Sequence, residues 1–126
     1  MTFGGEELDF TIGGGRLEAA LPAAATAGEP LVLEIEYRAR PRAGMYFQRH
    51  RRDPERTFVH TYGEGGLHAN WLSLYADVND KYTTEMVVTV PKPYAAVSNG
   101  RLVGTVEGKK TATFHWSQER SHPSYL

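Results

Sequence analysis

Cysteine is absent from this chain, so no disulfide stabilises the fold. A chain of 126 residues does not need one, because a domain of about this size buries roughly two-thirds of the surface of its unfolded chain. The absence also fits a reducing compartment, and we therefore expect a cytoplasmic protein. The length suits one domain, which we expect to cover residues 1–126.

Long apolar runs are also missing. No stretch approaches the roughly 20 residues needed to cross a bilayer. The first seven residues lack the basic start and the apolar core of a signal peptide. The longest stretch of small residues, 19–25, is interrupted by Pro22 and followed by Gly28 and Pro30, which predicts a connecting segment. We therefore expect no membrane association.

A surplus of positive charge is missing as well. The formal net charge is −1, from 14 Lys and Arg against 15 Asp and Glu. Because phosphate binding needs a basic surplus, we expect no nucleic acid partner. One basic cluster, Gln-Arg-His-Arg-Arg at residues 48–52, is followed at once by acidic residues. The acids favour a solvated loop, and an anion-binding site is the alternative.

Motifs of catalysis and metal binding are absent from the sequence. A zinc peptidase commonly carries His-Glu-x-x-His on a helix together with a distant Glu. The chain has five histidines and none of them forms such a pair: His50, His60, His68, His115 and His122. A Gly-x-Ser-x-Gly turn and a phosphate-binding loop are missing too. We therefore expect no catalytic residue, no metal ligand and no cofactor site in this chain.

The sequence does contain alternation with a period of two, the pattern of half-buried β-strands. The alternating segments are residues 8–12, 17–21, 31–38, 85–90 and 111–116. Glycines at 13–15, the pair Asn99-Gly100 and Gly108 predict hairpin turns between strands. No stretch shows a sustained helical period. We therefore predict about nine or ten short strands in an all-β fold, mainly an antiparallel β-sandwich with a saddle-like sheet.

Several motifs occur in an order that resembles a known family. They are Gly-Met-Tyr-Phe at 44–47, Thr-Tyr-Gly-Glu at 61–64, Trp-Leu-Ser-Leu-Tyr-Ala-Asp-Val-Asn-Asp-Lys-Tyr-Thr-Thr-Glu at 71–85, Val-Thr-Val-Pro at 88–91, Ser-Asn-Gly-Arg-Leu at 98–102 and Thr-Phe-His-Trp at 113–116. From about Leu8 onward, the chain is similar to the N-terminal domain of the aminopeptidase N and leukotriene hydrolase family of gluzincin zinc metallopeptidases. The resemblance implies a β-sandwich that packs on a catalytic domain, which this sequence does not contain.

The resemblance also implies a binding site at Tyr62, Gly63 and Glu64. In the family this loop reads Thr-Gln-Gly-Glu and reaches the active site, where its acid pairs with the free amine of the substrate. Glycines on both sides of Glu64 let the backbone approach a neighbour closely and aim the carboxylate outward. The implied ligand is a peptide N-terminus, and zinc is expected only in the absent catalytic domain.

The sequence departs from the family pattern at several positions. Tyr62 replaces the glutamine, while Ala69 and Ala76 stand where an arginine and an aspartate are usual, which implies a missing ion pair. The family's domain also begins several strands earlier and ends about a strand later, so we expect this chain to be a piece of such a domain or a reduced relative.

Two functions are open on the sequence. One is the non-catalytic accessory domain of a zinc aminopeptidase-like protein, with a catalytic domain as partner. The other is a stand-alone β-sandwich that serves as an interaction or scaffold module. The replaced Tyr62 favours the second function and the retained Glu64 favours the first. In either case uncovered sheet edges favour pairing with another copy of the chain, and we expect a homo-oligomer.

Overall fold

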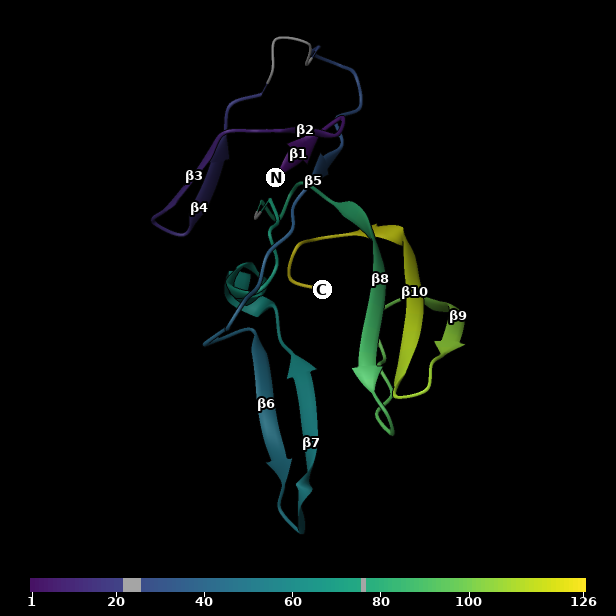
Figure 1. Cartoon of the computed structure of the whole chain (residues 1–126). Coiled ribbons are helices and arrows are strands. Elements are labelled where there is room, and N and C mark those ends of the chain that lie inside the picture. Colours follow the sequence, from purple (N-terminus) through teal and green to yellow (C-terminus); the bar gives the residue numbers. More distant parts are fainter. Residues whose placement is uncertain (22–25, 76) are drawn as a thin grey trace. The chain divides into compact units, whose positions relative to one another are not determined.

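The computed structural model describes residues 1–21, 26–75 and 77–126. The part of the expected connection at 22–25 lies outside the described residues, and so does Ala76. The described chain is mostly β, its sheets are antiparallel, and its single helical element is short, which confirms that part of the fold prediction. The chain divides into two compact units, Met1–Arg40 and Pro41–Leu126 (Figure 1).

The described residues of the first unit form five short strands. In one sheet β1 (Thr2–Phe3) lies between β2 (Glu6–Glu7) and β5 (Leu33–Glu34), and β3 (Phe10–Gly13) pairs with β4 (Arg16–Ala19) in another. Gly14 and Gly15 form the two-residue turn of the β3–β4 hairpin with φ of +57° and +75°. A type I′ turn needs positive φ at both positions, so the glycines favour this hairpin, and the prediction is confirmed.

The strand predicted over residues 31–38 is mostly wrong. Only Leu33–Glu34 forms a strand, because its partner β1 is itself two residues long. Alternation makes a strand only where a neighbour supplies ladder hydrogen bonds. Leu31 and Tyr37 are exposed on either side of β5.

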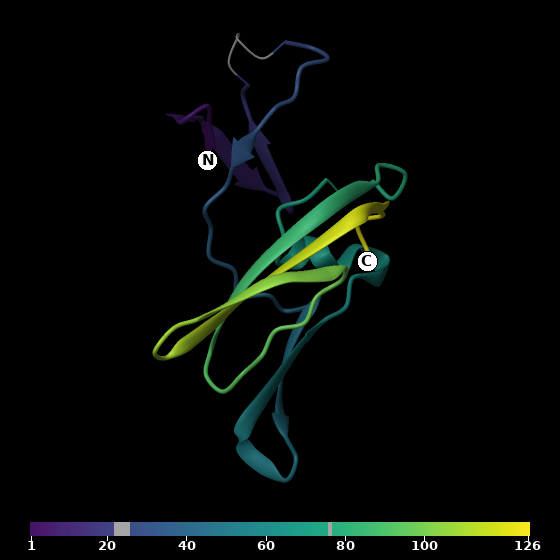
Figure 2. The ribbon, with the colours of Figure 1, turned by 90° about the vertical axis from the view of Figure 1, so that its right-hand side faces the viewer.

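The second unit is built on a three-stranded antiparallel sheet in the order β8 (Tyr82–Pro91), β10 (Thr111–His122), β9 (Arg101–Glu107). Figure 2 shows the three strands side by side as one twisted layer. Side chains of β8 alternate without exception between half-buried and exposed, as the period-two pattern predicts. The half-buried row packs beside Phe114 and Trp116 of β10, whose partners are Val88 and Met86.

The core of this sheet is small. Ala112 is the buried hydrophobic residue among the described ones, and none of their large side chains is fully buried. Many apolar side chains therefore remain in contact with solvent.

The hairpin predicted at Asn99-Gly100 is wrong, whereas the one at Gly108 is confirmed. The residues directly before Asn99, 92–98, form no strand that could pair with β9. Gly100 has a positive φ of +90°, but Asn99 does not have the positive φ that the first position of a type I′ turn needs. The Trp116 indole donates to the carbonyl of Ala96 over 3.1 Å and holds the connection against the sheet. A side chain at Gly100 would overlap the Ser117 carbonyl, so the glycine permits a close approach to β10 rather than a tight turn.

A separate hairpin joins β6 (Met45–His50) to β7 (Asp53–Thr61). The basic cluster lies at its tip, where Arg51 and Arg52 form the turn. The prediction of a loop for residues 48–52 is therefore correct only for these two positions, since the preceding three belong to β6. The amide of Thr57 donates to the Tyr94 hydroxyl over 3.2 Å, which links the hairpin to the segment after β8.

Candidate functional site

The segment Tyr62-Gly63-Glu64 connects β7 to a short 3₁₀ helix, η1 (Glu64–Asn70). The Tyr62 amide donates to the Gly44 carbonyl over 2.9 Å and so extends the hairpin ladder by one residue. The Gly63 carbonyl accepts from the amides of Gly66 and Leu67, both at 3.1 Å. Backbone hydrogen bonds therefore hold the segment on both sides of Gly63.

Gly63 is buried, and its role is to leave space. Its φ of −106° is open to any residue. A side chain there would overlap the ring of His68 and come within 2.6 Å of the Tyr125 carbonyl oxygen. The backbone at Gly63 therefore lies close to His68 and Tyr125, and this contact fixes where Glu64 begins η1.

Tyr62 and Glu64 are brought together on the surface. The Tyr62 hydroxyl donates a hydrogen bond to the Glu64 carboxylate, and both side chains are exposed. This hydrogen bond, followed by the repulsion between the carboxylate and a phenolate, raises the pKa of Tyr62 above its usual 10.0. Tyr62 therefore stays a neutral donor that orients the carboxylate.

His68 within η1 and Trp71 directly after it form a pair that no sequence pattern indicated. The Trp71 indole donates to Nδ1 of the buried His68 over 3.2 Å, and the two rings are perpendicular at 86°. Burial lowers the pKa of His68 below 6.5, which keeps the ring neutral and its Nδ1 free to accept. Gly44, with φ of +78°, lets the backbone lie against Leu67 and Trp71.

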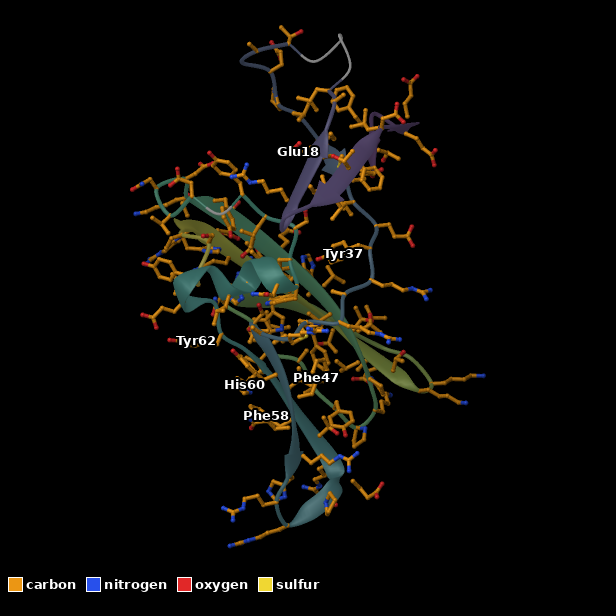
Figure 3. The ribbon with its side chains drawn as sticks, turned by 90° about the vertical axis from the view of Figure 1, so that its left-hand side faces the viewer. Glu18, Tyr37, Phe47, Phe58, His60 and Tyr62 are labelled. Carbon is orange, nitrogen blue, oxygen red and sulfur yellow. The ribbon has the colours of Figure 1, made fainter. Side chains whose placement is uncertain are left out.

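Aromatic rings form a strip on one face of the β6–β7 hairpin. The His60 ring stacks on Tyr46 at 5.2 Å between centroids and on Phe58 at 5.5 Å, with interplanar angles of 23° and 22°. Figure 3 shows Phe58, His60 and Tyr62 following one another along the hairpin. We call Tyr46, Phe58, His60 and Tyr62 the aromatic strip. The spacing of 58, 60 and 62 carries the period-two signal that would have predicted these three members of the strip.

The basic tip of the hairpin is exposed. Arg56 pairs with Asp53 over 3.0 Å, and Arg49, Arg51 and Arg52 project from the strand end and turn. Exposed pairs of this kind contribute about 0–1 kcal/mol.

Three of the histidines outside the strip, His68, His115 and His122, have structural partners. His115 lies 3.1 Å from Glu85, and His122 is buried between the Thr84 hydroxyl and the Pro123 carbonyl, at 3.0 Å from each. Within residues 1–21, 26–75 and 77–126 no three His, Cys, Asp or Glu side chains are grouped to hold a metal ion. No helix in the same described segments is long and apolar enough to cross a membrane.

Comparison with known proteins adds no relative: no protein-family model, curated protein or solved structure matches this chain. The resemblance to the gluzincin N-terminal domain therefore depends on the sequence motifs.

Proposed function

We propose that this chain is a non-catalytic β domain that binds the free amino terminus of a peptide through Glu64, as the accessory domain of a zinc aminopeptidase-like protein. The observation that supports the proposal most is the pairing of the Tyr62 hydroxyl with the exposed Glu64 carboxylate. The backbone beneath the pair is fixed by the buried Gly63. A carboxylate held in this way is suited to accept charge-assisted hydrogen bonds from a cation.

An ammonium group fits the hydrogen-bonding capacity of this pair. It offers three donors, and the carboxylate keeps free lone pairs after accepting from Tyr62. The Tyr62 oxygen, having donated its own proton to Glu64, retains lone pairs that can accept from the same ammonium. Acetylation of the amine removes both the charge and two of the donors, so the site would discriminate against a blocked peptide.

The proposal assigns binding and orientation to this chain and bond cleavage to a zinc-bearing partner domain. It includes the β-sandwich expected from the sequence, because the half-buried row of β8 and β10 is shielded from water only when a second layer covers it. Within this chain the residues that act are Glu64, which holds the amine, Tyr62, which orients the carboxylate, and Gly63, which fixes the loop.

The proposal is tested by titrating the 126-residue chain with one short peptide in free and N-acetylated form. We expect the free peptide to bind about three- to fivefold more tightly, because an exposed ion pair contributes up to about 1 kcal/mol. Where a partner shields the pair from water, the preference should rise to about 1.5–3 kcal/mol.

Glu64→Gln should abolish the preference for the free peptide, and Glu55→Gln is the matched control. Glu55 is also exposed and lies on the same hairpin. Equal and small losses on both peptides in the Glu64 variant would reduce Glu64 to an ordinary loop residue.

A stand-alone interaction module is the second candidate function, and the exposed apolar residues of the second unit favour it. Phe47 is 64% exposed, Val87 65% and Val106 70%. These side chains lie on β6, β8 and β9, and a partner protein that packs on these strands would remove them from water. The oligomeric state of the chain bears directly on this candidate.

A further inference from the structure

We propose that the aromatic strip selects peptides whose first residue is aromatic, with the amine on Glu64 and the first ring on the strip. The inference rests on the proposed function, because it takes the amine on Glu64 as its starting point. It adds a ligand class and three residues, Tyr46, Phe58 and His60.

The strip leads directly to the carboxylate. Phe58, His60 and Tyr62 occupy alternate positions of β7 and the residue after it, so they share one face of the hairpin. Tyr46 is the cross-strand partner of His60 and stacks on it. Side chains two residues apart on a strand are about 7 Å apart. A ring attached to the first residue of a peptide anchored at Glu64 therefore falls on Tyr62 and the Tyr46–His60 stack.

The rings are preorganised to receive another ring. His60 is held between two neighbours at 5.2 and 5.5 Å, and Phe58 at the end of the stack is 60% exposed. Aromatic rings prefer offset-stacked or edge-to-face partners at these separations. Because the stack is already formed, binding restricts the ligand ring but costs the protein little conformational entropy.

His60 also offers a polar contact. Its Nδ1 is buried and has no hydrogen-bond partner among the described residues. A buried N–H without an acceptor is rarer than a buried acceptor without a donor. The proton is therefore favoured on Nε2, which places a donor on the strip for the first carbonyl of a bound peptide.

The opposite face of the hairpin provides a matched control. Phe47 is the cross-strand partner of Val59, which lies between Phe58 and His60 in the sequence. Because neighbouring residues of a strand point to opposite faces, Phe47 lies on the face opposite the strip. Its exposure of 64% is close to the 60% of Phe58. Replacing either phenylalanine by alanine removes a ring of similar exposure, but only Phe58 belongs to the strip.

The test uses the full chain and two peptides, Phe-Ala-Ala-amide and Ala-Ala-Ala-amide, each free and N-acetylated, with affinities measured by NMR titration. We expect the free Phe peptide to bind about fivefold more tightly than the free Ala peptide. Phe58→Ala and His60→Ala should bring this ratio close to one and leave the preference for a free amine. Phe47→Ala should leave both ratios unchanged.

His60→Phe keeps the stack and removes the ring nitrogens, so it should retain the preference for the Phe peptide. If His60→Phe keeps the preference for the Phe peptide while His60→Ala loses it, the loss results from missing ring stacking and not from a folding defect. Equal affinity for Phe and Ala peptides, with the amine preference intact, overturns the aromatic selection alone. Equal affinity for free and acetylated peptides, or no binding of any peptide, overturns the proposed function as well.

Discussion

Gly63 is the residue on which the position of Glu64 depends. Tyr62 and Glu64 are exposed and meet each other, whereas Gly63 lies buried against His68 and Tyr125. The exposed pair is thereby attached to a part of the molecule that has little room to move. Tyr62, which departs from the glutamine of the family pattern, supplies a hydroxyl that orients the carboxylate.

Gly63→Ala should destabilise the chain by about 1–3 kcal/mol, the usual cost of placing extra atoms in a filled site. The added methyl group would overlap the His68 ring and crowd the Tyr125 carbonyl. Urea unfolding followed by tryptophan fluorescence measures the change. Gly104→Ala is the control, because Gly104 lies in β9 with negative φ and open space around it. Equal unfolding midpoints for the two variants would contradict this account of Gly63.

At the scale of the element, η1 depends on a neutral His68. Its ring accepts from Trp71 at Nδ1, and its carbonyl accepts from the amides of Trp71 and Leu72 at 3.0 and 2.9 Å. One histidine thus ties together the helix that begins with Glu64 and the chain that leaves it.

Acid should loosen η1. The pKa of His68 is lowered below 6.5 by burial, so the folded state holds this ring neutral while the unfolded chain takes up a proton below pH 6.5. The stabilisation is complete above pH 6.5 and is lost as the pH falls through the lower pKa of the folded state. Protonation of Nδ1 also removes the acceptor for the Trp71 indole.

The two indole N–H signals report this event directly in NMR spectra, since the chain has two tryptophans. The Trp71 signal should move as the pH falls below 6.5. The Trp116 signal should stay in place, because its acceptor is the carbonyl of Ala96, which does not titrate. Parallel movement of both signals would show a general change and not a change at His68.

The elements that the sequence predicted best are those with long partners. β8 and β10 pair continuously, from Pro91 with Thr111 to Thr84 with Gln118. The backbone hydrogen bonds of this ladder hold the alternating residues in an extended strand. Residues 31–38 carry a similar alternation and Asn99-Gly100 carries a turn signal, yet most of residues 31–38 and all of residues 92–98 lie outside strands. Pairing between strands depends on residues far away in the chain, which a local pattern does not contain.

The same limit applies to the site. Tyr62, Gly63 and Glu64 were proposed from a resemblance, and the structure brings the first and last into contact. The His68–Trp71 bond and the Tyr46–His60 stack join residues whose partnership depends on the turn of η1 and the register of β6 on β7. Neither is visible until the register is known.

At the scale of the whole molecule, exposed apolar surface and an open sheet edge are the features that call for a partner. β8 pairs only with β10 among the described strands, so its other edge is unpaired there. Its ten residues contain one charged side chain, Glu85. Charges and prolines are the usual protection of an edge, and this edge has its proline only at its last position, Pro91.

We expect the isolated chain to form a dimer through the β8 edge, which is one form of the homo-oligomer that the sequence predicts. Val87→Lys places a charge on this edge at a position 65% exposed and should shift the equilibrium toward monomer. Val97→Lys is the control, because Val97 is 84% exposed and lies outside the strands. Sedimentation equilibrium measures both variants. A wild-type chain that stays monomeric at high concentration, or a dimer that Val87→Lys leaves intact, would contradict pairing through this edge.

Binding of an amine by Glu64 is tested most directly on the carboxylate itself. In a chain labelled with ¹³C at the glutamate carboxyl carbons, the Glu64 signal can be assigned by its loss in Glu64→Gln and followed during titration with a peptide. We predict that the signal shifts when the free peptide is added and stays in place with the N-acetylated form, because only the free form brings an ammonium to the carboxylate. A Glu64 signal that ignores the free peptide, or that responds equally to both forms, would contradict the proposed function.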